Sequence, residues 1–112
     1  MRRLLAQSCP TGTSAESLFS LTVNDRFFNI DTLVITNVVY SPVKVSVFHD
    51  ADGSTYDATT ALLFEYLLDV GSQLVLNLNI ADYLTAGNVG IQIDTANGAC
   101  FTAYGEIPGE EL

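Results

Sequence analysis

The chain has 112 residues, and 48% of them are hydrophobic, which is enough apolar material for the core of one domain. Thirteen acidic residues against four basic ones give it a formal net charge of −9 at pH 7. Because nucleic acids and anionic membranes are bound through Lys and Arg, this charge argues against both as partners. No run of apolar residues approaches the roughly 20 that span a bilayer, so no transmembrane segment is expected.

Residues 1–16 show no hydrophobic periodicity and are expected to form an extended N-terminal arm. The apolar run in this arm is too short for the core of a signal peptide, which favours a protein made and kept in the cytoplasm, or built there into a larger assembly. Arg2 and Arg3 are most simply a solvated terminus. The alternative is that they pin the arm to an acidic partner surface. The candidate partner-binding residues are Arg2, Arg3, Leu4 and Leu5.

Beyond the arm, apolar and polar residues alternate with a period of two, which predicts half-buried strands. Turn-forming residues separate these stretches, and Asn97-Gly98 is the sharpest hairpin signal among them. The expected strands cover residues 17–23, 27–36, 43–48, 62–68, 74–80, 89–93 and 101–107. This pattern predicts an all-β fold, a single antiparallel β-sandwich or jelly roll over residues 17–107, followed by a short tail at 108–112.

Two of these stretches carry further expectations. Residues 27–36 are apolar on both faces, which is typical of a central strand covered on both sides. Residues 62–68 contain good helix formers, but we favour a strand because a turn-like segment, residues 70–72, follows them. One face of that strand would carry Leu62, Phe64, Tyr66 and Leu68.

The two cysteines, Cys9 and Cys100, lie at opposite ends of the chain. A disulfide and two separate thiols are both open from the sequence, and a reducing compartment favours the thiols. Zinc is not expected, because the chain has one histidine and no closely spaced cysteine pair.

The loop that begins at Asp50 starts like a calcium-binding loop, and the candidate ligands are Asp50, Asp52 and Asp57. Its glycine, however, stands at the fourth position instead of the sixth, and Ala61 occupies the twelfth, where a bidentate Glu is needed. An ordinary β-turn is therefore favoured, and no cofactor is expected, with calcium as the alternative.

Catalysis is not expected either. The single histidine, His49, stands beside Asp50, but no nucleophile elbow or reactive cysteine motif accompanies the pair. The chain also lacks phosphate-binding glycine motifs and the H-E-x-x-H pattern of zinc proteases. The sequence therefore predicts a protein that is not an enzyme.

The order of strands resembles that of the short β-sandwich virion proteins of tailed bacteriophages, over about residues 5–107. The stretches that carry the resemblance are Leu5-Ala6-Gln7-Ser8, Leu18-Phe19-Ser20-Leu21, Thr32-Leu33-Val34-Ile35-Thr36-Asn37, Val43-Lys44-Val45-Ser46-Val47-Phe48 with the Asp-Gly loop after it, Thr59-Thr60-Ala61-Leu62, Leu74-Val75-Leu76-Asn77-Leu78 and Phe101-Thr102-Ala103-Tyr104-Gly105-Glu106-Ile107. It implies a structural protein that acts by assembly.

Within that group the resemblance implies a capsid decoration (cement) protein on the outer surface of the mature head. Its partners would be the major capsid protein or other virion proteins, and a homo-oligomer, with a trimer favoured, would cover exposed sheet edges. The alternative is a tail or fibre component, either an adaptor or a receptor- or glycan-binding module. A glycan platform would expose Tyr40, Tyr56 and Tyr83 side by side.

Overall fold

The computed structural model describes residues 3–18, 27–50, 55–83 and 89–106. In chain order the strands are β1 (Arg3–Ser8), β2 (Glu16–Ser17), β3 (Phe27–Asn37), β4 (Val43–His49), β5 (Ala61–Leu68), β6 (Gln73–Tyr83), β7 (Val89–Ile93) and β8 (Ala99–Glu106). Within the described ranges, no helix is long and apolar enough to cross a membrane.

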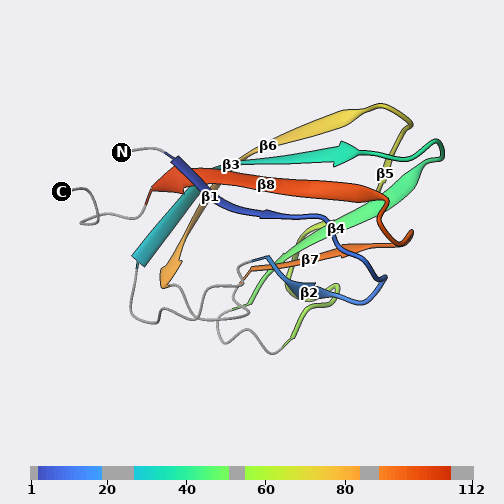
Figure 1. Cartoon of the computed structure of the whole chain (residues 1–112). Coiled ribbons are helices and arrows are strands. Elements are labelled where there is room, and N and C mark those ends of the chain that lie inside the picture. Colours follow the sequence, from blue (N-terminus) through green and yellow to red (C-terminus); the bar gives the residue numbers. More distant parts are fainter. Residues whose placement is uncertain (1–2, 19–26, 51–54, 84–88, 107–112) are drawn as a thin grey trace.

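The strands form two four-stranded sheets, and every pairing is antiparallel (Figure 1). Sheet A has the order β1-β8-β3-β6, and sheet B has the order β2-β7-β4-β5. The pairs β1–β8, β2–β7, β3–β6 and β4–β5 are those of one long antiparallel ribbon that is wound into a sandwich, which is the arrangement of a jelly roll. The expected all-β sandwich is therefore confirmed.

The core lies between the two sheets and is built by the alternation read from the sequence. In β4 and β7 the buried aliphatic residues are Val43, Val45, Val47, Val89, Ile91 and Ile93. Phe101 and Ala103 fill the same layer from β8. The residues between them point to the outer faces, as a period of two requires.

β3 differs from the expectation of a strand covered on both faces. It is central in sheet A, between β8 and β6, but only one of its faces enters the core, with Ile30, Leu33 and Ile35 buried and Val34 half-buried. A bulge at Asp31 changes the phase of the alternation, because Ile30 pairs with Gly105 and Thr32 pairs with Tyr104.

The segment at residues 61–68 is a strand, as favoured, but its four apolar residues do not share a buried face. Only Leu68 is buried, because the β4–β5 register shifts twice. At the first shift Glu65 adopts a left-handed φ of 50°, and its N–H donates to Ser46 Oγ at 2.8 Å. With these bulges Leu62, Phe64 and Tyr66 remain exposed, while Leu63 and Leu68 contact the core.

The Asn97-Gly98 turn is present, with Asn97 at a φ of 60°, but it does not close a hairpin. It joins β7 in sheet B to β8 in sheet A, so the two strands that it connects are not paired. The local sequence predicted the turn correctly, but the pairing of the strands depends on the jelly-roll topology, which the local sequence does not specify.

The arm expected at residues 1–16 is corrected over the part that the structure describes. Arg3–Ser8 pair with β8 as the edge strand of sheet A, and Glu16–Ser17 pair with β7. A register shift between Leu4 and Ala6 interrupts the alternation, which explains why the sequence showed no period of two. The sandwich therefore begins at β1. The expected tail at 108–112 lies outside the described residues.

Cys9 and Cys100 form a disulfide, which corrects the preference for two thiols. Ser8 pairs with Phe101 across β1 and β8, so Cys9 and Cys100 are the next opposing positions, with Cα atoms 4.1 Å apart. The pairing of the two ends of the chain, which the sequence did not reveal, brings the two sulfur atoms together.

Candidate functional site

The candidate calcium loop uses its described carboxylates to hold a turn. Asp50 Oδ2 accepts the Thr55 N–H at 2.8 Å, and Asp57 Oδ1 accepts the Thr59 N–H at 2.8 Å and the Thr59 hydroxyl at 2.5 Å. The third candidate ligand, Asp52, lies outside the described residues. In the described part of the chain, no three His, Cys, Asp or Glu side chains gather closely enough to hold a metal ion.

The Thr59 side-chain hydrogen bond, and then its backbone hydrogen bond, lower the pKa of Asp57 below its ordinary value. A lower pKa means that the folded chain favours the ionised form of Asp57. Ionised Asp57 therefore stabilises the fold above roughly pH 4, and this stabilisation is lost as the pH falls through the folded-state pKa. A carboxyl-detected NMR titration of wild type and Thr59→Ala is expected to show the lower pKa in wild type. Equal Asp57 titration in the two proteins would contradict this origin.

The three tyrosines expected in a glycan platform do not form a row. Tyr56 stacks on Phe48 with ring centroids 5.9 Å apart, and its hydroxyl lies 3.4 Å from Ser17 Oγ. Burial on the outer face of sheet B raises the pKa of Tyr56. Tyr40, which is 98% exposed, lies in the β3–β4 loop at the opposite end of β4. The side chain of Tyr83 is outside the described part.

The candidate partner-binding residues at the N-terminus differ in exposure because β1 pairs with β8. Leu5 packs against the core, which makes it a structural residue, while Leu4 is half exposed and pairs with Tyr104. Arg3 is exposed and pairs with Gly105. Arg2 lies outside the described residues.

An apolar surface that the sequence did not predict follows the free edge of sheet B. We call it the β5 patch, and its members, with exposures of 49%, 44%, 54% and 47%, are Leu62, Tyr66, Leu67 and Val70. β5 is an edge strand, and its two bulges interrupt the regular row of N–H and C=O groups that another strand could pair with. The patch therefore offers side chains for packing. Leu62 and Tyr66 belong to the apolar face expected from the sequence, whereas Leu67 lies outside that face and Val70 lies in the expected turn. The bulged register, which the sequence does not show, leaves Leu62 and Tyr66 exposed.

Asn37 fixes the loop and the strand end that border this patch. Its buried side-chain amide donates to Ser41 O at 2.9 Å and to Leu68 O at 3.0 Å, and its Oδ1 accepts the Val39 N–H at 2.9 Å. One side chain thus ties the β3–β4 loop to the end of β5, and the loop presents Tyr40 from a fixed base.

Replacing Asn37 with alanine is expected to lower the free energy of unfolding by about 1–3 kcal/mol, because buried backbone groups lose their partners. Urea denaturation followed by circular dichroism measures the change. Tyr40→Ala is the matched control on the same loop, and its side chain is 98% exposed, so its effect is expected to stay within about 0.5 kcal/mol. Equal losses in the two variants would contradict the role of Asn37.

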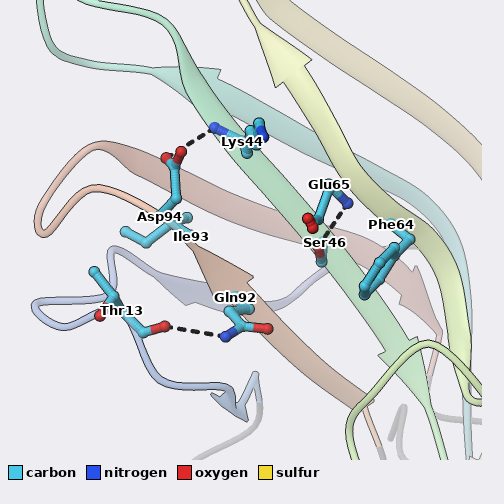
Figure 2. A pocket seen from close by; sticks show the side chains of 8 residues that line it. All are labelled: Thr13, Lys44, Ser46, Phe64, Glu65, Gln92, Ile93 and Asp94. Carbon is cyan, nitrogen blue, oxygen red and sulfur yellow. Dashed lines mark hydrogen bonds between the residues drawn. The ribbon is translucent and has the colours of Figure 1, made fainter.

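A groove of about 550 Å³ lies on the outer face of sheet B (Figure 2). Lys44 and Ser46 of β4 and Gln92 and Ile93 of β7 lie along its floor, and its other lining residues are Thr13, Phe64, Glu65 and Asp94. Hydrogen bonds join its parts. Asp94 Oδ1 accepts the backbone N–H of Lys44 at 2.9 Å, and the Asp94 N–H donates to Lys44 O at 3.1 Å. Gln92 Nε2 donates to Thr13 O at 3.1 Å, and Ser46 Oγ accepts the backbone N–H of Glu65 at 2.8 Å.

No family model and no curated protein matches this chain. Among solved structures, it is similar to a chain in the structure of infectious bursal disease virus strain Gx, with a TM-score of 0.46 and 15% identity over 98% of this chain. It is also similar to a chain in the T13 viral particle of IBDV, with a TM-score of 0.45 and 15% identity over 96% of this chain. This protein spans 32% of the length of each of those chains.

Proposed function

We propose that this protein is a structural protein of a virion, and specifically a capsid decoration (cement) protein of a tailed bacteriophage that stabilises the mature head by protein–protein contacts. The eight-stranded jelly roll, which viral capsid domains use, supports this proposal. The strand-order resemblance to short phage virion proteins supports it as well. Because the same fold also serves lectins, the proposal depends on the surface of this chain.

The observation that carries the proposal is the β5 patch. Three large apolar side chains of the edge strand β5, and Val70 in the turn that follows it, are each close to half exposed. The bulges of β5 prevent regular strand addition. Exposed apolar surface of this kind marks a site of protein interaction. We assign to it the contact with the major capsid protein or another virion protein, with Tyr66 as an aromatic anchor.

The charge and the disulfide are consistent with a place on the outer surface of the shell. A net charge of −9 is tolerated away from the packaged nucleic acid, whereas a protein lining the genome would need basic residues. The Cys9–Cys100 disulfide is of a kind that persists in oxidising surroundings such as virion surfaces. Three copies around a symmetry axis would in addition cover one another's exposed edge strands.

The first test is the number of copies per particle, measured by quantitative mass spectrometry of purified virions against their major capsid protein. A ratio near one to one or one to three supports the cement function. A few to a few dozen copies would overturn it in favour of a tail adaptor or a receptor-binding component. Absence from virions would overturn the virion proposal as a whole.

A second test addresses the β5 patch directly. Leu67→Glu places a carboxylate in the proposed apolar contact and is expected to weaken binding to particles that lack this protein by about tenfold or more, measured by co-sedimentation. Val75→Glu is the matched control, because Val75 is 49% exposed on β6 in the other sheet. Equal binding by the two variants would show that the patch does not carry the contact.

A further inference from the structure

We propose that the groove on the outer face of sheet B is a binding site for a neutral saccharide, with a hexopyranose unit seated against Phe64 and hydrogen-bonded by Gln92, Asp94 and Lys44. Its volume of about 550 Å³ falls within the range of small-ligand sites. The groove adjoins the β5 patch but shares none of its four residues. The proposal applies whether the protein sits on a head or on a tail.

The lining residues offer both hydrogen-bond donors and hydrogen-bond acceptors to a polyhydroxylated ligand. Sugar hydroxyls donate and accept, so a site must present acceptors and donors together. The carboxylate of Asp94 and the amide oxygen of Gln92 are acceptors, while the ammonium of Lys44 is a donor. Figure 2 shows these side chains around one hollow.

Phe64 supplies the apolar side of the site. It lines the groove from β5, and the residue is 51% exposed, so its ring is accessible to the C–H groups of a pyranose. A pyranose ring has an apolar C–H face and polar hydroxyl groups. An exposed aromatic ring beside polar groups from other strands can contact both.

The polar groups are held in place before any ligand arrives. Gln92 Nε2 is bonded to Thr13 O, which orients the amide and leaves its oxygen available to accept. Asp94 Oδ1 accepts the backbone N–H of Lys44, which holds the Asp94 carboxylate against β4 and leaves the Lys44 ammonium outside this bond. Because these side chains are already oriented, binding loses less conformational entropy than it would in a loose site.

The charges in the groove select against acidic sugars. Two carboxylates, those of Glu65 and Asp94, face one ammonium, that of Lys44, and the chain as a whole carries −9. An anionic ligand such as a sialic acid would meet net repulsion, whereas a neutral sugar would not. Neutral hexopyranoses are therefore the ligand class that fits.

The test is a titration of the full ¹⁵N-labelled chain with methyl glycosides of glucose, galactose, mannose and N-acetylglucosamine into the millimolar range, with N-acetylneuraminic acid as the anionic comparison. At least one neutral glycoside is expected to give saturable shifts at the amides of Lys44, Glu65 and Gln92. Phe64→Ala and Gln92→Ala are each expected to raise its Kd about three- to tenfold. Tyr40→Ala, an exposed aromatic residue outside the groove, should leave the Kd unchanged.

Absence of saturable shifts with all four neutral glycosides would overturn the proposal. So would shifts that survive in both groove variants while the variants remain folded by the same spectra, or stronger shifts with the anionic sugar. The result is separable from the virion proposal, because Gln92 lies outside the β5 patch. Gln92→Ala is expected to raise the sugar Kd without weakening particle binding.

Discussion

Gly105→Ala is expected to prevent the protein from folding stably, with a loss in the free energy of unfolding of about 4 kcal/mol or more. Gly105 lies in β8 between Arg3 of β1 and Ile30 of β3. A Cβ at this position would collide with the backbone carbonyl oxygen of Asn29 and would lie 2.9 Å from Ile30 Cα. These are backbone atoms of a central strand, so they cannot move aside without breaking the pairing of β3 with its neighbours.

Two other glycines give matched comparisons for this variant. At Gly90 a Cβ would meet the ring of Tyr56 at 2.6 Å, but that ring is a side chain that can rotate, so Gly90→Ala is expected to cost about 1–3 kcal/mol. At Gly12 nothing lies within 4 Å, and Gly12→Ala is expected to change stability by less than about 0.5 kcal/mol. Urea denaturation of the three variants checks the order, and a Gly105→Ala protein as stable as Gly90→Ala would contradict it.

The sequence predicted the fold class because three strands keep an uninterrupted period of two. The inward residues of β4, β7 and β8 were identified correctly, since no bulge interrupts the alternation within Val43–Val47, Val89–Ile93 or Phe101–Gly105. The pattern was misleading wherever a bulge shifts the register. At β1 the shift hid a strand, and at β5 it left Leu62, Phe64 and Tyr66 of the expected apolar face exposed.

The candidate sites depend on which strands become neighbours, and local sequence does not contain that information. The groove exists only because β2, β7, β4 and β5 are adjacent in sheet B. This order brings together Gln92 of β7, Lys44 of β4, Phe64 of β5 and Thr13 from the segment before β2. In the sequence, none of these four residues differs in pattern from the other residues of its own segment. The Asp50 loop shows the opposite case, because its turn is made by hydrogen bonds over a few residues, and the sequence favoured that turn.

The Cys9–Cys100 disulfide is expected to supply a large share of the stability of this small domain. It joins residues 91 positions apart, so it closes almost the entire chain into one loop in the unfolded state. Loop-closure entropy for a ring of this size corresponds to about 4–5 kcal/mol, against a total of roughly 5–15 kcal/mol for a typical domain. The same bond secures the edge strand β1 at the point where the chain leaves β1 and beside the point where it enters β8.

The double variant Cys9→Ser, Cys100→Ser is therefore expected to unfold at a markedly lower urea concentration than the wild type. A phosphine reductant should lower the midpoint of the wild type toward that of the double variant and leave the double variant unchanged, which separates the loss of the bond from the effect of the substitutions. Because Cys9 also begins the segment that carries Thr13 over the groove, amide exchange at Gln92 and its neighbours should accelerate in the reduced protein. Two titratable thiols in the native, non-reduced chain, or a wild-type midpoint that does not respond to reductant, would contradict this account.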